Sequence, residues 1–583
     1  MFQFKHTKSY HKNHPNPQFY RSNFLNLNGK WKFAFDEENI GVLQGFYKEF
    51  PQNHLEINVP YAYQTFKSGI NTNDEIDYIW YEKEIEINDL AKVYLIHFLG
   101  VDYETDVFIN GLYVFHHIGG YDAFSFELTN LIKGKNKITV RVTDKGHIDQ
   151  IRGKQHWKNE NETCFYSKSS GIYKDVYVEV LNKNYIKEFY LKGDYLTKTL
   201  KAKFIPNIED DYQIEISFDD INKKFNFDLN NKENEFLMTL DDVLPYSYEN
   251  PKLYNLTIKL FKKGEICDEF LTYCGFISLK SKDGKIFIND KDTYLKMVLD
   301  QGYFNGGGLT PSEEDAILDL SLIRDCGFNG LRKHEKIETP LFYYYQDLFG
   351  LYASLEIPSV MNYSYDFYKQ YNKQAPCMYL DNFNHPSIIE IVLFNETWGV
   401  FDIVRRYKEV LDFVNNQYFK FKKMAEDRFV ISNDGWEQTY TDIITCHNYS
   451  ETSHDLKKIL DKGVEDIKHN KNALCVDGDK YFFVDGYANY KGQPFALTEF
   501  AGIAFNANFE DAKWGYGKGV TSETEYLAKY KDQLDYIYSN KNFRCFCMTQ
   551  LTDVEQEING IFTADRKAKI NINKLKKLHD RFK

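Results

Sequence analysis

The second half of the chain alternates short apolar runs with longer segments of helical period, and this rhythm constrains the fold more than any other feature. Ser312 and Gly327 suit the start and end of a helix over residues 313–326, and a second helix is predicted over residues 339–349. A continuously apolar run such as residues 388–394 is typical of a parallel strand buried on both faces. Eight strands in about 300 residues match the count and length of a (β/α)8 barrel. They are predicted at residues 294–299, 329–332, 351–356, 388–394, 429–432, 442–449, 495–499 and 543–548.

The first part of the chain is predicted to be all-β, in two successive domains. Residues 1–181 alternate apolar and polar positions, and Asn110-Gly111 is a strong signal for a type I′ hairpin turn. This pattern favours a β-sandwich of the jelly-roll kind, and residues 182–276 repeat the alternation over the length of an immunoglobulin-like sandwich. The barrel domain would then be residues 277–583. The strands expected before the barrel are 81–87, 93–99, 106–109, 138–142, 176–180, 186–191, 212–218, 256–261 and 270–274.

Charge, hydropathy and cysteine usage narrow the class of protein further. The formal net charge of −13 argues against a nucleic-acid partner, which requires clustered Lys and Arg. Residues 1–21 lack the apolar core of a signal peptide, and no apolar run is long enough to span a membrane. The nine cysteines are odd in number, lie mostly inside apolar runs and complete no zinc-ligand cluster. We therefore expect a cytoplasmic protein with reduced thiols, no membrane contact and no protein-bound metal site.

Two glutamates stand where predicted barrel strands end, which is where such barrels carry their catalytic side chains. Glu396 follows the fourth strand, and Glu499 ends the seventh. Two carboxyl groups facing one pocket suffice for glycoside hydrolysis, because one protonates the leaving oxygen and the other attacks or stabilises the anomeric carbon. A single strand-end Glu more often pairs with Lys or Arg, but two at separate strands, each with its own motif, favour catalysis.

The sequence around these glutamates resembles glycoside hydrolase family 2, which includes β-galactosidases, β-glucuronidases and β-mannosidases. The most specific match is the run NHPSIIEIVLFNETW at residues 384–398, which resembles the acid/base motif of that family. The resemblance implies retention through a covalent glycosyl-enzyme and the domain order jelly roll, immunoglobulin-like sandwich, barrel. Further similar runs are NLNGKW at 26–31, FLGVD at 98–102, DVFING at 106–111, SGIYKDV at 170–176, DIITCHNY at 442–449 and TEF at 498–500.

The resemblance carries functional roles onto five residues. Glu396 matches the acid/base and Glu499 the nucleophile. Asn395 matches the residue that hydrogen-bonds the sugar 2-hydroxyl, although capping of the strand end is the plainer alternative. Tyr449 resembles an aromatic residue whose phenol donates to the nucleophile, against a role in packing alone. Arg332 matches the arginine that keeps the nucleophile ionised.

Four other residues at strand ends are candidates for sugar binding. Asp300 and Gln301 end the first strand, and they would bind sugar hydroxyls or cap a helix. Trp398 and Trp436 follow the fourth and fifth strands, where an aromatic wall would stack on a sugar; buried packing is the alternative.

Three more candidates come from the resemblance alone. His447 lies in the run that resembles the sixth strand. His334 is displaced by one position from a histidine that many β-galactosidases carry three residues after their arginine. Met548 stands where the eighth strand usually presents an aromatic platform to the sugar.

One departure from the family bears on the sugar. Family β-glucuronidases hold the sugar carboxylate with an Asn-x-Lys pair just before a segment like GIFT, which stands here at residues 560–563. Glu557 and Asn559 occupy the two places, and a carboxylate there would repel an anionic sugar. Asn489 and Lys491 have the right spacing but lie in another loop. The sequence therefore favours a terminal neutral sugar, a β-galactoside foremost, over a uronide.

The function predicted from the sequence is a retaining exo-β-glycosidase that acts on an oligosaccharide or another glycoside. Mannosidase, arabinofuranosidase and uronidase specificities stay open within the family, as does transfer to a sugar instead of water. A non-catalytic carbohydrate-binding protein is the alternative of another class, disfavoured because both carboxylates are present. No cofactor is expected, and a bound cation is left undecided. Family members are often dimers or tetramers, so a homo-oligomer is also left open.

Overall fold

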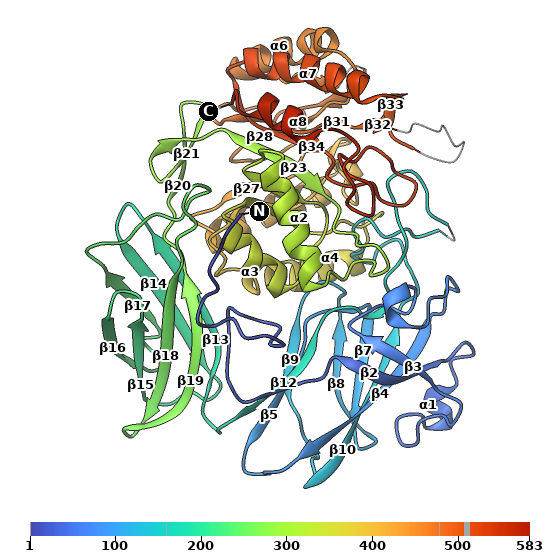
Figure 1. The fold of residues 1–583 in the computed structure, drawn as a ribbon, viewed down its shortest axis with the longest axis vertical. Helices are drawn as coiled ribbons and strands as arrows, with labels where there is room; N and C mark the ends of the chain where they lie inside the picture. The colour runs from blue at the N-terminus through green and yellow to red at the C-terminus, as the bar shows by residue number, and fades with distance from the viewer. Residues whose placement is uncertain (1, 159, 477, 506–513, 583) are drawn as a thin grey trace.

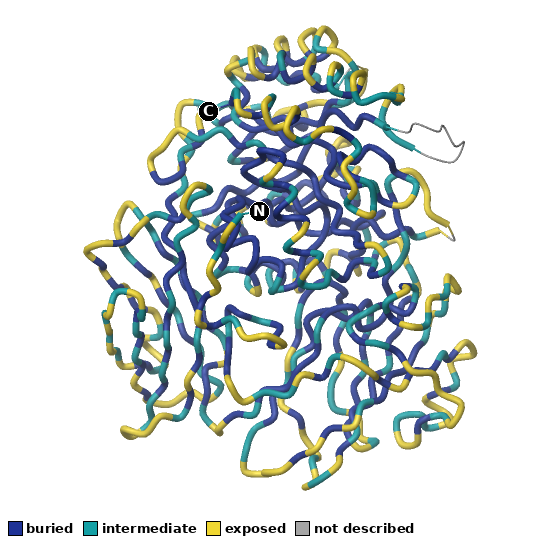
Figure 2. The backbone as a smooth tube through the Cα atoms, in the orientation of Figure 1, coloured by how far each residue is buried: buried dark blue, intermediate teal, exposed yellow. Residues whose placement is uncertain are grey.

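The computed structural model describes residues 2–158, 160–476, 478–505 and 514–582. Two β-sandwiches lie below a parallel barrel in Figure 1, the first in blue and the second in green. Figure 2 shows that buried positions concentrate in the barrel, whereas turns and the outer faces of helices are exposed. None of the helices in these described ranges is long and apolar enough to cross a membrane.

The first sandwich packs a four-stranded antiparallel sheet against a six-stranded one. Apolar side chains that alternate along the strands meet between the sheets, with Trp31, Ile96 and Val140 at most 1% exposed. Asn110 and Gly111 have φ values of 50° and 79°, which confirms the predicted hairpin turn. The sheets are β1 (Phe24–Asn26), β12 (Val176–Leu181), β5 (Val93–Phe98) and β9 (Phe124–Glu127), and β3 (Leu55–Val59), β2 (Gly29–Phe35), β4 (Tyr78–Ile87), β10 (Gly134–Thr143), β7 (Glu104–Ile109) and β8 (Leu112–Ile118).

The second sandwich has the sheets of three and four antiparallel strands that are typical of an immunoglobulin-like fold. Its core includes Phe204, Ile214 and Ile258. Arg21 joins the two sandwiches, because its guanidinium donates to Asp268 of the second and to Glu179 of the first. The sheets are β13 (Ile186–Asp194), β14 (Thr199–Pro206) and β17 (Glu235–Thr239), and β16 (Lys223–Leu229), β15 (Tyr212–Phe218), β18 (Tyr254–Lys262) and β19 (Glu265–Cys274).

The barrel contains the eight parallel strands predicted from the sequence. They form one sheet in the order β27-β26-β25-β24-β23-β34-β31-β28, so that it is nearly closed between β27 and β28. Apolar side chains fill the barrel and the space beneath its helices. In chain order the strands are β23 (Leu295–Asp300), β24 (Gly330–Lys333), β25 (Tyr352–Glu356), β26 (Ile388–Val392), β27 (Phe429–Ile431), β28 (Ile444–His447), β31 (Phe495–Ala501) and β34 (Phe543–Thr549).

Helices follow every barrel strand except β27. Residues 432–443, all of them described, connect β27 to β28 without a helix, which departs from strict alternation. Ser312 accepts from Asp315 N, and the Asp315 carboxylate accepts from Ser312 N; this capping box and the φ of 86° at Gly327 confirm the predicted helix ends. The helices are α2 (Glu313–Asp325), α3 (Pro340–Phe349), α4 (Tyr365–Leu380), α5 (Lys408–Met424), α6 (Ser453–Lys468), α7 (Glu523–Ser539) and α8 (Ile572–His579).

Shorter elements connect and cover these layers. They are α1 (Gly41–Gln44), η1 (Phe66–Ser68), β6 (Val101–Asp102), β11 (Gly171–Ile172), β20 (Leu279–Lys282), β21 (Lys285–Ile288), β22 (Lys291–Asp292), η2 (Phe401–Ile403), β29 (Leu474–Val476), β30 (Lys480–Tyr481), β32 (Ile503–Phe505) and β33 (Tyr516–Val520).

Candidate active site

The C-terminal ends of the barrel strands bring the predicted residues together. Arg332 lies near the end of β24, Glu396 in the turn after β26, His447 at the end of β28 and Glu499 near the end of β31. Because parallel strands end at the same rim of a barrel, side chains far apart in sequence meet there. A carboxylate oxygen of Glu396 lies within 4.8 Å of one of Glu499.

The guanidinium of Arg332 contacts several of the polar side chains at this rim. It donates to Glu356 from Nε at 2.9 Å and from Nη2 at 3.1 Å, and to Glu499 Oε1 from Nη1 at 2.6 Å. Nη2 also donates to Asn395 Oδ1 at 2.8 Å and lies 3.1 Å from Asp434 Oδ2. Arg332 is only 1% exposed, so these contacts form in a medium where ion pairs are screened weakly.

Glu499 is held as an anion. Its Oε1 accepts from Arg332, and its Oε2 accepts from the Tyr449 hydroxyl at 2.5 Å. Burial alone would raise the pKa of Glu499, but His447, Arg332 and the Tyr449 hydrogen bond lower it to about 2. Tyr449 is fixed in turn by Tyr516, whose ring stacks on it with centroids 3.4 Å apart. Tyr449 therefore donates to the Glu499 carboxylate, as the resemblance to the family implied.

His447 lies between the two glutamates. Its Nδ1 is 2.8 Å from Glu396 Oε1 and 3.5 Å from Glu499 Oε1, and its Nε2 is 3.4 Å from Asp434 Oδ2. Burial lowers the pKa of the His447 imidazole, but the Glu499 and Asp434 carboxylates, with hydrogen bonds to Asp434 and Glu396, raise it to about 10. Although burial would raise the pKa of Asp434, Arg332 and His447 hold it well below its ordinary value.

Glu396 is placed by a turn with unusual backbone angles. Glu396 and Thr397 have φ values of 50° and 64°, in the left-handed region that non-glycine residues seldom adopt. Glu396 N donates to Asp434 O at 2.9 Å, and Thr397 N donates to Asn433 Oδ1 at 3.0 Å. The Glu396 side chain is 13% exposed, more than that of Glu499 at 5%. The turn thus places the partly exposed carboxyl group of Glu396 close to the buried carboxyl group of Glu499.

Four predicted residues have partners within the protein. Asn395 donates from Nδ2 to Glu335 Oε1 at 3.2 Å while its Oδ1 accepts from Arg332. Asp300 binds Lys333 Nζ at 2.5 Å and accepts from the loop amide Gly302 N; the helix that follows is capped by Ser312, so Asp300 is not a helix cap. Gln301 donates to Gln550 Oε1, and its own Oε1 is buried without a partner in the described structure. His334 Nδ1 lies 3.2 Å from Glu356 Oε1.

The predicted aromatic wall is present only in part. Trp398 is half-buried and meets Phe165 of the first domain edge to face. Trp436 lies beside the His447 ring, and its Nε1 has no hydrogen-bond partner among the described residues. The Met548 side chain is wholly buried in the larger barrel core. The last residue of β34 is Thr549, whose Oγ1 lies 3.1 Å from the Tyr449 hydroxyl, and contact of Met548 with the sugar stays a prediction.

Part of the charge network was not predicted from the sequence. Glu356 and Asp434 bind Arg332, and Glu335 binds Asn395. Glu356 ends a predicted strand, so the rule that located Glu396 and Glu499 would also have found it. Burial raises the pKa of Glu356 and of Glu335 to about 7 each, although a nearby cation opposes each rise.

The first domain also reaches the rim, which no motif predicted. Arg152 N and Gly153 N both donate to Ser359 O, after β25. The Tyr166 hydroxyl donates to Glu557, after β34. The Lys154 ammonium lies in this buried segment, and among the described residues its polar contact is Cys164 Sγ at 3.8 Å.

Lys154 is electrostatically coupled to the barrel carboxylates. Burial lowers the pKa of Lys154, but Cys164 and the carboxyl groups of Glu335, Glu396 and Glu499 raise it above its ordinary value. The first domain therefore supplies a cation to a site whose carboxylates come from the barrel.

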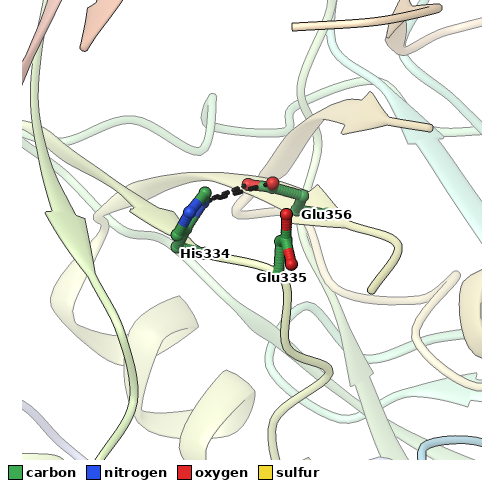
Figure 3. A group of neighbouring side chains, drawn as sticks. All are labelled: His334, Glu335 and Glu356. Carbon is green, nitrogen blue, oxygen red and sulfur yellow. Dashed lines mark hydrogen bonds and ion pairs between the residues drawn. The ribbon is translucent and has the colours of Figure 1, made fainter. Parts of the chain in front are cut away.

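One group of side chains has the spacing of metal ligands. His334, Glu335 and Glu356 each offer an atom within 4.8 Å of the others (Figure 3). Both oxygens of Glu356 already accept from Arg332, whose fixed charge repels a second cation. The two candidate glutamates and His447 form a similar group, but there the protonated imidazole supplies the positive charge. Neither group is assigned to a metal.

A cavity of about 670 Å³ lies between the first domain and the barrel. Its lining includes Ser167 and Lys168 on one side and Tyr303, Glu555 and Arg566 on the other. Neither candidate glutamate lines it. We place the chemistry at the glutamates, where the charged side chains meet, and not in this cavity.

Comparison with known families agrees with this arrangement. The model described as "Glycosyl hydrolases family 2, sugar binding domain" matches residues 24–182. The model described as "Glycosyl hydrolases family 2, TIM barrel domain" matches residues 279–583, which is more than half of the chain.

Individual relatives carry two different names. A β-galactosidase of Thermoanaerobacter pseudethanolicus is 28% identical over 414 residues, covering 66% of this chain and 50% of that protein. A putative β-glucuronidase of Formosa agariphila is 26% identical over 395 residues, covering 65% of this chain and 46% of that protein. The chain thus spans about half the length of these curated relatives. A solved β-glucuronidase from an uncultured Clostridium species has a TM-score of 0.77 at 17% identity, covers 96% and 98% of the two chains, and shows the shared fold.

The docking of the first domain onto the barrel can be tested at Gly153. Its φ is 58°, and a Cβ there would lie 2.2 Å from the Glu335 carbonyl oxygen, which is backbone and cannot turn aside. Gly264 is a matched control with a φ of 82° and open space around it. We expect Gly264→Ala to cost about 1–2 kcal/mol through backbone strain, and Gly153→Ala about 1–3 kcal/mol more through the clash. Urea denaturation and hydrogen exchange over residues 152–157 measure both; equal losses in the two variants would contradict the docking.

Proposed function

The chain belongs to glycoside hydrolase family 2, and from that premise we propose that it is a retaining exo-β-glycosidase with Glu499 as nucleophile and Glu396 as acid/base. The observation that carries the proposal is the short gap between the two carboxylates, whose oxygens come within 4.8 Å. Retaining enzymes have carboxyl groups about 5–5.5 Å apart, whereas inverting enzymes leave about 6.5–9.5 Å for a water molecule.

The two carboxyl groups have the environments that the two roles require. Glu499 is ionised and almost fully buried, and both of its oxygens are oriented by donors, as suits a nucleophile that attacks from a fixed position. Glu396 is more exposed and faces Glu499 from another strand end of the same rim. In the first step Glu499 bonds to the anomeric carbon while Glu396 protonates the departing oxygen; in the second, Glu396 takes a proton from water, which releases the sugar from Glu499.

A neutral terminal sugar, a β-galactoside foremost, is the substrate we propose. Glu557 stands in the place of an amide, with its carboxylate bonded to Tyr166 and to Asn559 Nδ2. Burial raises the pKa of Glu557 to about 7, so part of its population is anionic at neutral pH. Carboxyl groups also outnumber cations around the site, and a uronate would add another negative charge. The carboxyl groups are Glu335, Glu356, Glu396, Asp434, Glu499 and Glu557, against Arg332, His447 and Lys154.

A β-uronide is the second candidate, and Lys154 is the observation that favours it. Of the lysines considered from the sequence, Lys333 is bound by Asp300 and Glu338, and Lys491 lines another cavity. Lys154 is buried near the carboxylates without an ion pair to a described carboxylate within 4 Å. Relatives named β-glucuronidase are consistent with this alternative.

The substrate proposal predicts that neutral aryl glycosides are better substrates than the glucuronide. We expect kcat/KM for nitrophenyl β-galactoside to exceed that for nitrophenyl β-glucuronide, because the uronate would meet Glu557. Mannoside and arabinofuranoside are measured in the same series, with product analysis for transfer to a sugar. Faster turnover of the glucuronide would reject the neutral sugar, and loss of that turnover in Lys154→Met, with retained folding, would assign the carboxylate to Lys154.

The acid/base proposal predicts a dependence on the leaving group. Glu396→Ala should slow nitrophenyl glycosides much more than dinitrophenyl glycosides, which leave with little protonation, by about 10²-fold or more. The fall in rate at alkaline pH should vanish, because it is caused by deprotonation of Glu396, and the variant has no carboxyl group at this position. Glu409→Ala, an exposed glutamate on α5, is the control. Equal losses on both leaving groups, with glycosylation shown to limit the rate, would reject Glu396 as the acid.

A further inference from the structure

His447 contacts both proposed catalytic carboxylates and a third one behind them. Nδ1 faces Glu396 Oε1 at 2.8 Å, with Glu499 Oε1 at 3.5 Å, and Nε2 faces Asp434 Oδ2 at 3.4 Å. The residue is 1% exposed. Each ring nitrogen therefore faces a carboxylate, and only a protonated imidazole can donate from both nitrogens.

The backbone leaves the ring little freedom. Gly435 has a φ of 92°, and a Cβ there would lie 2.4 Å from Nδ1 and 2.5 Å from Cγ of His447. His447 N donates to Gly435 O at 3.2 Å. The residue before Gly435 holds Glu396, because Glu396 N donates to Asp434 O. The turn at residues 433–435 thus positions the imidazole and the Glu396 carboxyl group relative to each other.

We propose that His447 is the positioning residue of the acid/base step: a protonated imidazole that orients Glu396 through Oε1 and stabilises the anion that remains when Glu396 has given up its proton. The inference rests on the proposed function, in which Glu396 is the acid. It adds a residue that acts on this acid through its charge and its hydrogen bond.

The proton balance of the cycle leaves His447 unchanged. In the first step the other oxygen of Glu396 gives its proton to the departing oxygen as the C–O bond breaks and Glu499 bonds to the anomeric carbon. His447 keeps both of its protons and faces a new carboxylate. In the second step water loses a proton to Glu396 as its oxygen bonds to the anomeric carbon and the bond to Glu499 breaks. His447 therefore acts through charge and orientation alone.

The charges around the ring support its cationic form. Burial lowers the pKa of His447, but the carboxylates around it raise it to about 10. Arg332 opposes this, with Nη1 3.4 Å from Nε2. A positive charge 2.8 Å from Glu396 Oε1 attracts the negative charge that this carboxyl group carries after it has given up its proton. The charged or titratable side chains near the ring include Glu396, Asp434, Glu499, Arg332 and His334.

His447→Asn tests the proposal, because it removes the charge and keeps an amide in the same space. The alkaline fall of kcat/KM should move up by about one pH unit or more. Nitrophenyl glycosides should slow more than dinitrophenyl glycosides, because a weaker acid protonates the leaving oxygen less readily. Gly435→Ala should shift the fall in the same direction by displacing the ring, whereas Gly134→Ala, with a φ of 99° and open space, should not. The proposal is overturned if the alkaline fall of kcat/KM in His447→Asn lies at the same pH as in the wild type and the rates on nitrophenyl and dinitrophenyl glycosides decrease equally.

A second measurement does not depend on turnover. The imidazole ¹⁵N shifts of His447, assigned by their absence in His447→Asn, are titrated in the wild type and in Glu396→Gln. We expect the wild-type ring to stay protonated beyond pH 8 and to titrate at lower pH in Glu396→Gln. Titration near the ordinary value of 6.5 in both proteins overturns the proposal. Coupled titration in a protein that hydrolyses no glycoside would instead reject the proposed function and retain the His447–Glu396 pair.

Discussion

The guanidinium of Arg332 neutralises a set of carboxylates that the barrel could not otherwise bury together. It contacts Glu356, Asp434 and Glu499 at distances from 2.6 to 3.1 Å. Removing one partner of a buried ion pair leaves the other charge buried without a counter-ion, which lowers the free energy of unfolding by about 3–5 kcal/mol. Here one side chain is the counter-ion of three carboxylates. The position of the proposed nucleophile depends on this residue, and through Asp434 so does the turn that places Glu396.

The first domain reaches the site through a few contacts on its rim. Residues 152–153 bind the loop after β25, Tyr166 binds Glu557 after β34, and Lys154 brings a positive charge toward the carboxylates. Without the first domain, the barrel would lack the positive charge of Lys154 and the contacts of residues 152–153 at its rim. The first domain is therefore part of the site in the physical sense, because its side chains change the charge that a substrate meets.

Much of this could be predicted from the sequence, because its strongest signals are local. Apolar runs located the eight barrel strands, Asn110-Gly111 located a hairpin, and the strand-end rule together with a long motif located Glu396 and Glu499. The contacts of Arg332 with Glu499 and of Tyr449 with Glu499 follow the roles expected of them.

The remaining features depend on the tertiary structure. Met548 was predicted to contact the sugar, but adjacent side chains of a strand point to opposite faces of the sheet, and which of them reaches the site depends on how the strand lies in the barrel. Here Thr549 contacts Tyr449, and Met548 is buried in the barrel core. Lys154 belongs to no motif and gains its neighbours only when the first domain docks. Asp300 pairs with Lys333, and nothing in the local sequence distinguishes that pairing from sugar binding.

The central claim, that Glu499 forms a covalent bond to the sugar, can be tested by trapping that bond. A 2-deoxy-2-fluoro glycoside of the sugar that is turned over, with a dinitrophenyl leaving group, slows the breakdown of the intermediate so that it accumulates. Digestion and mass spectrometry should find one fluorosugar ester, on the peptide containing residues 495–501 and at Glu499. An ester on Glu396 or on another carboxylate would contradict the account, as would a product of inverted configuration released without a covalent intermediate.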